Sequence, residues 1–368
     1  MNFIALKADL LNALQKTHTI VASKSTLSIL ANVLIEAVEE KLIFTTTNLQ
    51  VGIRCQSPAT IVSPGATTLP ARFLFAIVRE LAAAEVQVEV DENNVASIRC
   101  GESFFKLLGI SKEEFPRVAE FEGEPLFSMA QKDLKEMLRK TSFAVSREDP
   151  RHFLTGMYFS IADGRLLLVG TDGRRLSRIT HDISVKEGYT GNLIVPIKAI
   201  EELEKMLGEE GNADVHLAGN QVAFRLGTDL LVSLLIDARF PDYEGVIPKT
   251  SAASAVLNRE EFAAMVRQAA LVASEQSSSV VLSFSGSELV ISARSPEVGE
   301  ARVVMPAKFT GDPLAVGFNP NCIRDVLNCM DEEEITLQVT DSLSPGIITG
   351  EGTFLHLIMP MRLPEGEV

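Results

Sequence analysis

The sequence predicts an α+β protein in which one domain pattern is repeated three times. Three observations support this fold class: an amphipathic segment that recurs at intervals of 124 and 128 residues, a second helical segment beside a proline in each copy, and short strand-like runs between them. The length of 368 residues suits three domains of equal size. Each copy is therefore expected to contain two helices and a set of strands.

The first helix of each copy is predicted from the spacing of its apolar residues. In the first copy Leu10 is followed four positions later by Leu14, and the same spacing recurs in the other two copies. Residues four apart lie on one face of a helix, so that face should pack against the domain core. The predicted helices cover residues 9–17, 133–141 and 261–269.

The second helix of each copy begins beside a proline. Leu69-Pro70, Val195-Pro196 and Phe318-Asn319-Pro320 each lead from a strand-like residue into a helical pattern, and proline is tolerated at such a helix start. The predicted helices cover residues 72–81, 198–207 and 322–330.

Strands are predicted from β-branched and alternating runs, and the domain limits follow from turn-rich seams. The clearest strand segments are residues 42–47, 166–169 and 280–284, and each copy closes after a strand-like run with an apolar residue and proline: Phe115-Pro116, Phe240-Pro241 and Met359-Pro360. Acidic or flexible segments near residues 120–125 and 249–255 mark the seams. The predicted domains are residues 1–121, 122–249 and 250–368.

Composition restricts the classes of function. The chain is 46% hydrophobic and 23% charged, which is typical of a globular protein. A net charge of −15 and the absence of Trp argue against a surface that stacks unpaired bases, so any nucleic-acid binding should be directed at the backbone of a duplex. The first residues do not resemble a signal peptide, and the apolar runs are too short to span a membrane, which predicts a soluble cytoplasmic protein.

Motifs for catalysis and metal binding are not found. The sequence has no phosphate loop, GxGxxG turn, HExxH helix or GxSxG elbow, and its five histidines are scattered. Neither a cofactor nor a metal site nor an enzyme is therefore predicted. The four cysteines, with Cys322 and Cys329 on one helical face, are expected to be buried free thiols, and acidic runs such as 331–334 are expected to be solvated.

Several segments carry a specific resemblance to one family. Thr171-Asp172-Gly173-Arg174-Arg175-Leu176, its lead-in from Asp149 to Met157, Arg239-Phe240-Pro241-Asp242-Tyr243 with the following Val246-Ile247-Pro248, and the terminal Met359-Pro360-Met361-Arg362-Leu363 resemble the bacterial DNA polymerase III beta subunit, the DNA sliding clamp. The resemblance implies three clamp domains, each with two helices packed on antiparallel sheets. It also implies a head-to-tail homodimer that closes into a ring of six domains.

The resemblance implies a function without catalysis. Such a ring encircles double-stranded DNA without reading its sequence, because base contacts would pin it in place. The implied partners are the replicative polymerase catalytic subunit, the clamp loader, repair polymerases and mismatch-repair proteins, in a cytoplasmic and nucleoid-associated setting. The alternative is a clamp-fold scaffold or a duplicate clamp that serves repair proteins or inhibitor resistance.

The family match assigns three sets of residues. The peptide-binding cleft would comprise Leu154, Thr171, Gly173, Arg174, Arg175, Leu176, Pro241, Val246, Asn319, Leu357, Ile358, Met359, Pro360, Met361, Arg362 and Leu363. The DNA-contacting residues would be Lys24, Arg72, Arg151, His152 and Lys198. The dimer interface would bring Phe105 and Leu107 against Leu271 and Val272 of the other copy, as one strand edge meeting another.

The chain departs from the usual family pattern at several positions. Gly245 stands where many relatives carry arginine, Arg174 often corresponds to histidine, and Cys322 replaces a common tyrosine. Residues Pro364 to Val368 form an acidic extension that we expect to be mobile and to screen part of the cleft. The acidic charge should lie mainly on the outer face of the ring, with Lys and Arg on the helices that line the hole.

Overall fold

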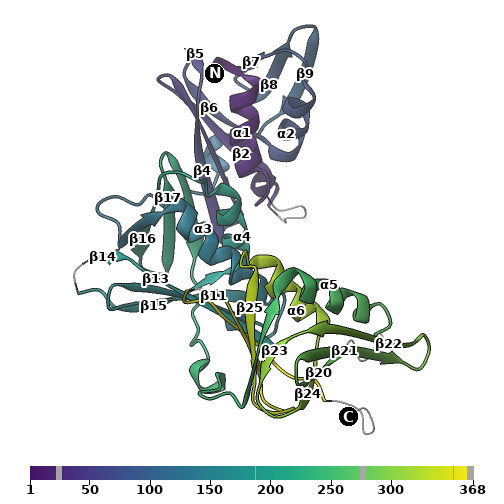
Figure 1. Ribbon diagram of the computed structural model, residues 1–368. Coiled ribbons are helices and arrows are strands. Elements are labelled where there is room, and N and C mark those ends of the chain that lie inside the picture. Colours follow the sequence, from purple (N-terminus) through teal and green to yellow (C-terminus); the bar gives the residue numbers. More distant parts are fainter. Residues whose placement is uncertain (22–26, 187, 274–278, 351, 363–368) are drawn as a thin grey trace. The chain divides into compact units, whose positions relative to one another are not determined.

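The computed structural model describes residues 1–21, 27–186, 188–273, 279–350 and 352–362 (Figure 1). The six predicted helices are confirmed, each within two residues of its expected limits. They are α1 (Lys7–Thr17), α2 (Ala71–Glu80), α3 (Gln131–Arg139), α4 (Ile197–Met206), α5 (Arg259–Ala270) and α6 (Pro320–Cys329).

The helix starts differ between the copies. Pro70 immediately precedes α2, whereas Pro320 is the first residue of α6. The amide of Asn321 donates a 2.9 Å hydrogen bond to the Asn319 side chain, which therefore caps the helix. Because of this shift of one residue, Asn321 rather than Cys322 occupies the position of Arg72 and Lys198.

The chain folds into two compact units that do not coincide with the three copies. The first unit contains residues 1–135, 183–188 and 198–235, and the second contains residues 136–182, 189–197 and 236–368. The central copy therefore contributes to both units.

The first unit has a five-stranded and a nine-stranded antiparallel sheet. In spatial order the smaller sheet is β5 (Thr60–Ser63), β1 (Asn2–Leu6), β7 (Glu85–Val90), β8 (Val95–Cys100) and β9 (Ser103–Leu108). The larger is β14 (Ser184–Val185), β10 (Phe127–Ala130), β16 (Asn212–Ala218), β17 (Gln221–Leu226), β18 (Asp229–Leu234), β4 (Val51–Pro58), β3 (Lys41–Thr47), β2 (Asn32–Val38) and β6 (Gly65–Pro70).

The second unit has a nine-stranded and a four-stranded sheet. The larger is β15 (Gly191–Pro196), β11 (Gly156–Ala162), β12 (Arg165–Thr171), β13 (Arg175–Asp182), β27 (Leu355–Ile358), β26 (Gly346–Thr349), β25 (Glu334–Val339), β19 (Ala253–Asn258) and β23 (Lys308–Thr310). The smaller is β22 (Gly299–Pro306), β21 (Glu288–Ser295), β20 (Val280–Ser285) and β24 (Leu314–Phe318).

The strands reveal the repeat more clearly than the sequence does. Within the described residues each copy supplies nine strands, β1–β9, β10–β18 or β19–β27, and divides them into a half-sheet of five and a half-sheet of four. Each nine-stranded sheet joins the four strands of one copy to the five strands of the next. The joining pairs, which we call internal junctions, are β4 with β18 and β13 with β27.

The core of the first unit lies beneath α1 and α2. Leu10 and Leu14 of α1 and Leu74 and Val78 of α2 are buried against the strands, as their four-residue spacing predicts. Leu14 has no exposed surface, so truncating it to alanine would cost about 2–5 kcal/mol.

Three details correct the sequence-based expectations. Strand β19 begins at Ala253, inside the segment expected to be a flexible seam. Phe115 follows the 3-10 helix Lys112–Glu114 rather than a strand. Cys55, Cys100 and Cys329 are buried as predicted, but Cys322 is only half-buried.

Among the described residues, no helix combines the length and apolar character needed to cross a membrane.

Candidate functional site

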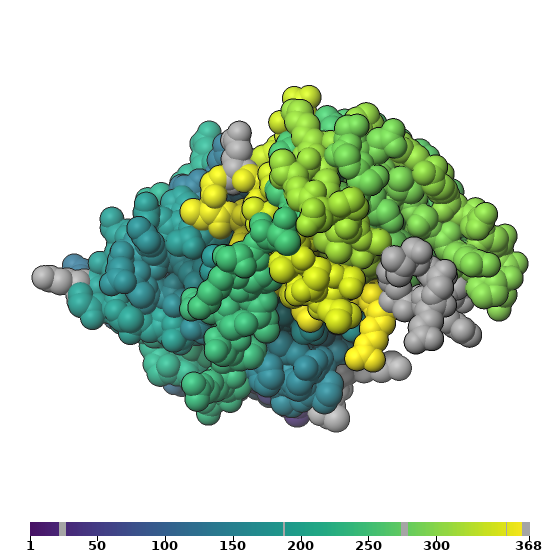
Figure 2. Space-filling view, turned by 60° about the horizontal axis from the view of Figure 1, so that its bottom comes forward, coloured from purple at the N-terminus to yellow at the C-terminus, as the bar shows by residue number. Residues whose placement is uncertain are grey.

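An apolar cleft of about 260 Å³ lies in the second unit. Its lining comes from four separate segments, and Figure 2 shows two of them, the green segment near residue 243 and the yellow segment near residue 357, side by side at the surface. The lining residues are Arg151, Phe153, Leu154, Thr171, Gly173, Arg175, Leu176, Pro241, Asp242, Tyr243, Val246, Leu357 and Met359.

The turn between β12 and β13 shapes one wall of the cleft. The Asp172 carboxylate accepts hydrogen bonds from the amides of Arg174 and Arg175, at 2.9 and 3.0 Å. The amide of Gly173 donates to the Thr171 hydroxyl, and Gly173 has a φ of 84°, a conformation that favours glycine. Asp172-Gly173 therefore forms a tight turn that fixes Thr171 and Arg175 beside the cleft.

Arg175 is held rigidly in this wall. Its guanidinium donates to Asp325 of α6 at 2.6 Å and to Asp172 at 3.1 Å, and it lies over the ring of Phe143. Burial alone would lower the pKa of Arg175, but the hydrogen bond to Asp325 and the neighbouring carboxylates raise it above its ordinary value. The charge is neutralised locally, so Arg175 serves the cleft more by its shape than by its charge.

The floor and rim of the cleft differ in exposure. Leu176 and Leu357, which pair across β13 and β27, are 3% and 2% exposed and form the floor. Val246 and Met359 are 49% and 39% exposed and form an apolar rim. An exposed apolar rim over a buried apolar floor is typical of a site that binds apolar side chains.

Aromatic residues anchor the segment that forms the opposite wall. Tyr158 of β11 stacks on Phe240 with ring centroids 4.6 Å apart, and Tyr243 lies within 6.3 Å of both rings. Burial, helped by the Glu244 carboxylate, raises the pKa of Tyr243 to about 12. Tyr243 is therefore a neutral part of this wall at physiological pH.

A charged pair stands at the mouth of the cleft. Arg151 donates to both carboxylate oxygens of Asp149, at 2.9 and 3.0 Å, and these hydrogen bonds hold the pKa of Asp149 below its usual range. Arg151 was expected to contact DNA, but the structure places it on the cleft lining, as it does Phe153, Asp242 and Tyr243, which the sequence reasoning did not assign to the cleft. The family resemblance of the segment from Asp149 to Met157 could have indicated that Arg151 and Phe153 lie at the cleft.

Nine residues expected at the cleft are brought together there: Leu154, Thr171, Gly173, Arg175, Leu176, Pro241, Val246, Leu357 and Met359. Others lie elsewhere for identifiable reasons. Asn319 caps α6, Ile358 points away from Leu357 as strand alternation requires, and the amide of Met361 is bonded to Gly317. Arg174, Pro360 and Arg362 also do not line the cleft, and Leu363 is outside the described residues.

The residues expected to contact DNA are only partly assembled. Arg72 and Lys198 are exposed at equivalent positions, the second residues of α2 and α4. His152 is exposed in the 3-10 helix His152–Thr155. Lys24 is outside the described residues.

The expected interface residues occupy different kinds of structure. Phe105 and Leu107 lie on β9, the last strand of its sheet. Leu271 and Val272 do not form a strand edge, because they follow the C-terminus of α5. One edge strand of that copy is β22, which ends the four-stranded sheet.

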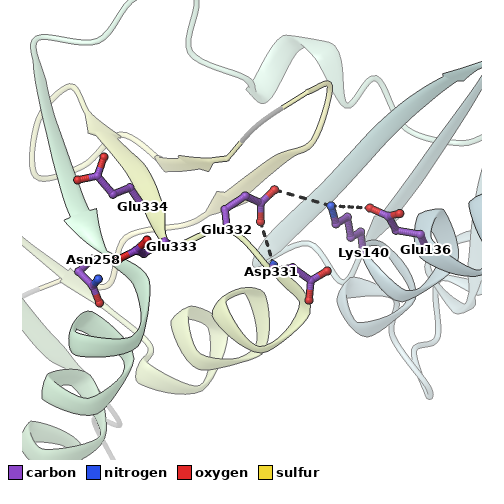
Figure 3. Close-up of a pocket in the computed structure, with 7 residues that line it drawn as sticks. All are labelled: Glu136, Lys140, Asn258, Asp331, Glu332, Glu333 and Glu334. Atoms are coloured by element: carbon purple, nitrogen blue, oxygen red, sulfur yellow. Dashed lines mark hydrogen bonds and ion pairs between the residues drawn. The ribbon is translucent and has the colours of Figure 1, made fainter.

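A second depression in the same unit is acidic (Figure 3). Its lining combines Lys140 and Asn258 with carboxylates: Glu136, Asp331, Glu332, Glu333 and Glu334. Lys140 is 6% exposed and pairs with Glu136 at 2.9 Å and Glu332 at 3.8 Å, while Asp331 pairs with Arg139. The run 331–334 is thus partly ion-paired rather than simply solvated, and the described residues contain no group of side chains arranged to hold a metal ion.

Beneath the cleft lies a buried polar pair. The Ser177 hydroxyl is 2.5 Å from Nδ1 of His356, and neither residue is exposed. Burial, together with the nearby Arg175, lowers the pKa of His356 to about 3. The imidazole is therefore neutral, and it packs against Phe143 at 5.3 Å.

The copies of nine strands, joined by sheets that continue from one copy to the next, define a triplicated α+β protein. Three family models of the DNA polymerase III beta subunit match the chain: the N-terminal domain matches residues 1–119, the central domain residues 128–242 and the C-terminal domain residues 244–362. The chain is 38% identical to the beta sliding clamp of Chlamydia muridarum over 99% of both chains, and 30% identical to that of Bacillus subtilis over 98% and 100%.

Solved structures agree with this assignment. The crystal structure of the Bacillus subtilis sliding clamp matches with a TM-score of 0.94 at 29% identity, over 99% of this chain and 100% of that chain. A Pseudomonas aeruginosa sliding clamp bound to griselimycin matches with a TM-score of 0.94 at 30% identity, with the same coverage. The chain belongs to the bacterial DNA polymerase III beta subunit family, the sliding clamps. Its members are processivity factors in DNA replication, and the protein is not an enzyme.

Proposed function

We propose that two copies of this chain close head to tail into a ring of six domains around duplex DNA, and that the ring keeps partner proteins on their template. The main support for this proposal is the number of strands in each sheet. Inside the chain, four strands of one copy always join five of the next, but the first copy's five-stranded half and the third copy's four-stranded half remain unjoined. A second chain would extend both sheets to nine strands and would pair the edges of β9 and β22.

The exposed side chains on β9 support this closure. Phe104 and Phe105 are 52% and 38% exposed, whereas Leu230 and Leu231, the equivalent residues of β18, are 9% and 0% exposed. Leu271 is 81% exposed and is equivalent to Phe143, which packs on His356 at the second internal junction. Since His356 is equivalent to Phe105, Leu271 would pack on Phe105 of the second copy.

The distribution of charge supports DNA passing beside the helices. The six α-helices carry 12 of the chain's 34 Lys and Arg and 10 of its 49 Asp and Glu, a net charge of +2. The remainder carries 22 basic and 39 acidic residues, or −17. A helix-lined hole would therefore repel phosphate far less than the outer face, and Arg72 and Lys198 are suited to contact the backbone. Such a ring would work where the duplex is, at the nucleoid.

The cleft is proposed to dock short linear segments of partner proteins. Its floor suits one or two apolar side chains, and Met359 can adapt to side chains of different shape. The proposed partners are the replicative polymerase catalytic subunit, the clamp loader, repair polymerases and mismatch-repair proteins. Tethering to a ring would raise the local concentration of a polymerase at the primer end.

Retention on DNA tests the ring. The protein is loaded by a clamp loader onto nicked circular DNA, which is then linearised, and the bound fraction is followed by gel filtration. Topological retention predicts that the ring slides off the free ends after linearisation. Binding that persists on linear DNA would show retention by contact and would contradict the proposal.

Truncation of the cleft rim tests docking. The double variant Val246→Ala with Met359→Ala should weaken binding of a clamp-loader or polymerase peptide about tenfold, because two apolar contacts are lost from exposed positions. Leu343→Ala, which truncates a 74% exposed side chain elsewhere in the unit, serves as the matched control. Equal affinity of both variants and the parent by isothermal titration would remove the cleft from the docking site.

A further inference from the structure

Arg175 lines the cleft, but the carboxylate that holds it most closely does not. The guanidinium donates to Asp325 at 2.6 Å and to Asp172 at 3.1 Å. Asp172 belongs to the turn that carries Arg175, whereas Asp325 belongs to α6 and is not part of the cleft lining. The side chains of Arg175 and Asp325 are 15% and 33% exposed, so the pair is partly withdrawn from water. A hydrogen-bonded ion pair in such surroundings is stronger than one in bulk water.

The first internal junction shows what the helix carboxylate does where no arginine faces it. Strand β4 pairs with β18 as β13 pairs with β27, and the shared register puts Val51 in the place of Arg175. Val51 is apolar and buried. Counted from the helix starts, Glu202 of α4 stands at the position of Asp325, and its carboxylate pairs with Lys205 of its own helix at 2.8 Å. Between the two internal junctions, the contact from helix to arginine thus belongs to the one that borders the cleft.

Carboxylates neutralise the positive charges of the cleft. Among the described lining residues there are two cations: Arg151, which pairs with Asp149, and Arg175, which pairs with Asp172 and Asp325. Asp149 and Asp172 lie close in sequence to the arginines they hold, whereas Asp325 comes from the third copy. Without Asp325, the guanidinium would lose its shortest hydrogen bond. Because a guanidinium has five N–H donors, some would then be available to a carboxylate of a docked segment.

We propose that Asp325 sets the charge selectivity of the cleft: it occupies Arg175 and so prevents this arginine from binding acidic residues of docked segments. The inference rests on the proposed docking function and names a residue outside the cleft that controls it. Asp325 is a positioning residue, because it affects a docked segment only through Arg175. The cleft then selects partners mainly by their apolar anchors, and the recognition of charge is left to the exposed pair of Arg151 and Asp149.

Peptide affinities test this selectivity. Two fluorescein-labelled peptides from a clamp-loader segment share one apolar anchor and differ only in the residue beside it, which is Glu or Gln. Asp325→Asn keeps a hydrogen-bond acceptor but removes the charge, so it should shift the ratio of the two affinities towards the Glu peptide by about fivefold at low salt. The shift should shrink at high ionic strength in fluorescence anisotropy titrations, because it is electrostatic. Adding Arg175→Gln should abolish it, because the freed guanidinium is its source.

Two control variants separate the charge of Asp325 from other effects. Asp325→Glu preserves the charge and should keep the parent ratio. Asp331→Asn removes a carboxylate that pairs with Arg139 elsewhere in the same unit, and it should also keep the ratio. Circular dichroism checks the folding of each variant.

Three results would contradict the inference, and they can be told apart. Equal losses of affinity for both peptides in Asp325→Asn would assign Asp325 a purely structural role. An unchanged ratio in that variant would show that Asp325 does not govern selectivity. A parent protein that binds neither peptide would contradict the docking function on which the inference rests.

Discussion

The two internal junctions are built on the same strand pairing, but the second borders the cleft, whereas a connecting segment of the chain packs onto the first. In the first unit, a Cβ at Gly52 would lie 2.9 Å from Cγ1 of Val118, so the connecting segment presses directly onto the sheet. Phe121 of that segment packs with Leu230 and Val232. The site equivalent to the cleft is therefore filled by the chain itself.

In the second unit, Leu176 stands in the place of Gly52. The connecting segment packs through Phe240, Tyr243 and Ile247 against the buried cluster that contains Leu176 and Leu357, and it leaves a cleft over this cluster. A single change from glycine to leucine, combined with a differently anchored connection, separates a closed core from a binding surface. Repeated domains can thus share one backbone fold and have different functions.

The largest expected effect comes from replacing Gly52 of the first junction by leucine, the residue at the equivalent position of the second junction. Gly52→Leu should lower the free energy of unfolding by about 2–3 kcal/mol, because the new side chain overlaps Val118 in a filled space. Urea denaturation measures the change. Adding Val118→Ala should recover part of the loss, and an unchanged midpoint for Gly52→Leu would show that the first junction is not tightly packed.

A smaller effect should distinguish the second junction by its pH dependence. The pKa of His356 is about 3 in the folded protein and near 6.5 when unfolded, so the unfolded chain binds more protons between these values. Stability due to the neutral imidazole is complete above pH 6.5 and is lost as the pH falls, by about 2 kcal/mol at pH 5. His356→Gln should remove this dependence in urea titrations at pH 7.5 and pH 5. An equal loss of stability in both proteins would assign it to other groups.

The smallest effect concerns the charged pair of Arg151 and Asp149 beside the cleft of the second junction. Arg151→Gln should reduce the affinity of a peptide carrying an acidic residue beside its apolar anchor by about two- to threefold at low salt, because this exposed charge is screened and already shared with Asp149. The difference should disappear at high ionic strength in fluorescence anisotropy measurements. A uniform loss at every salt concentration would indicate a structural role instead.

The helices were predictable because their apolar spacing is local, as Leu10 and Leu14 illustrate. The nine cleft residues followed from a resemblance spread over four segments. The position of Arg151 was not predictable, because its direction depends on an irregular turn and on Asp149. The pairing of Asp331 and Glu332 with Arg139 and Lys140 depends on tertiary contacts across almost 200 residues, which an acidic run in the sequence does not reveal.

The shared nine-stranded sheets restrict how the chain can be divided experimentally. A fragment ending near residue 121 would contain the whole first copy, but it would expose β4 where β18 normally pairs. Ile53, which is fully buried, would then lie on an open edge. Stable fragments should instead keep the five strands β10, β14 and β16–β18 with the first copy. A fragment should therefore contain a whole internal junction and should not end at the limit of a repeat.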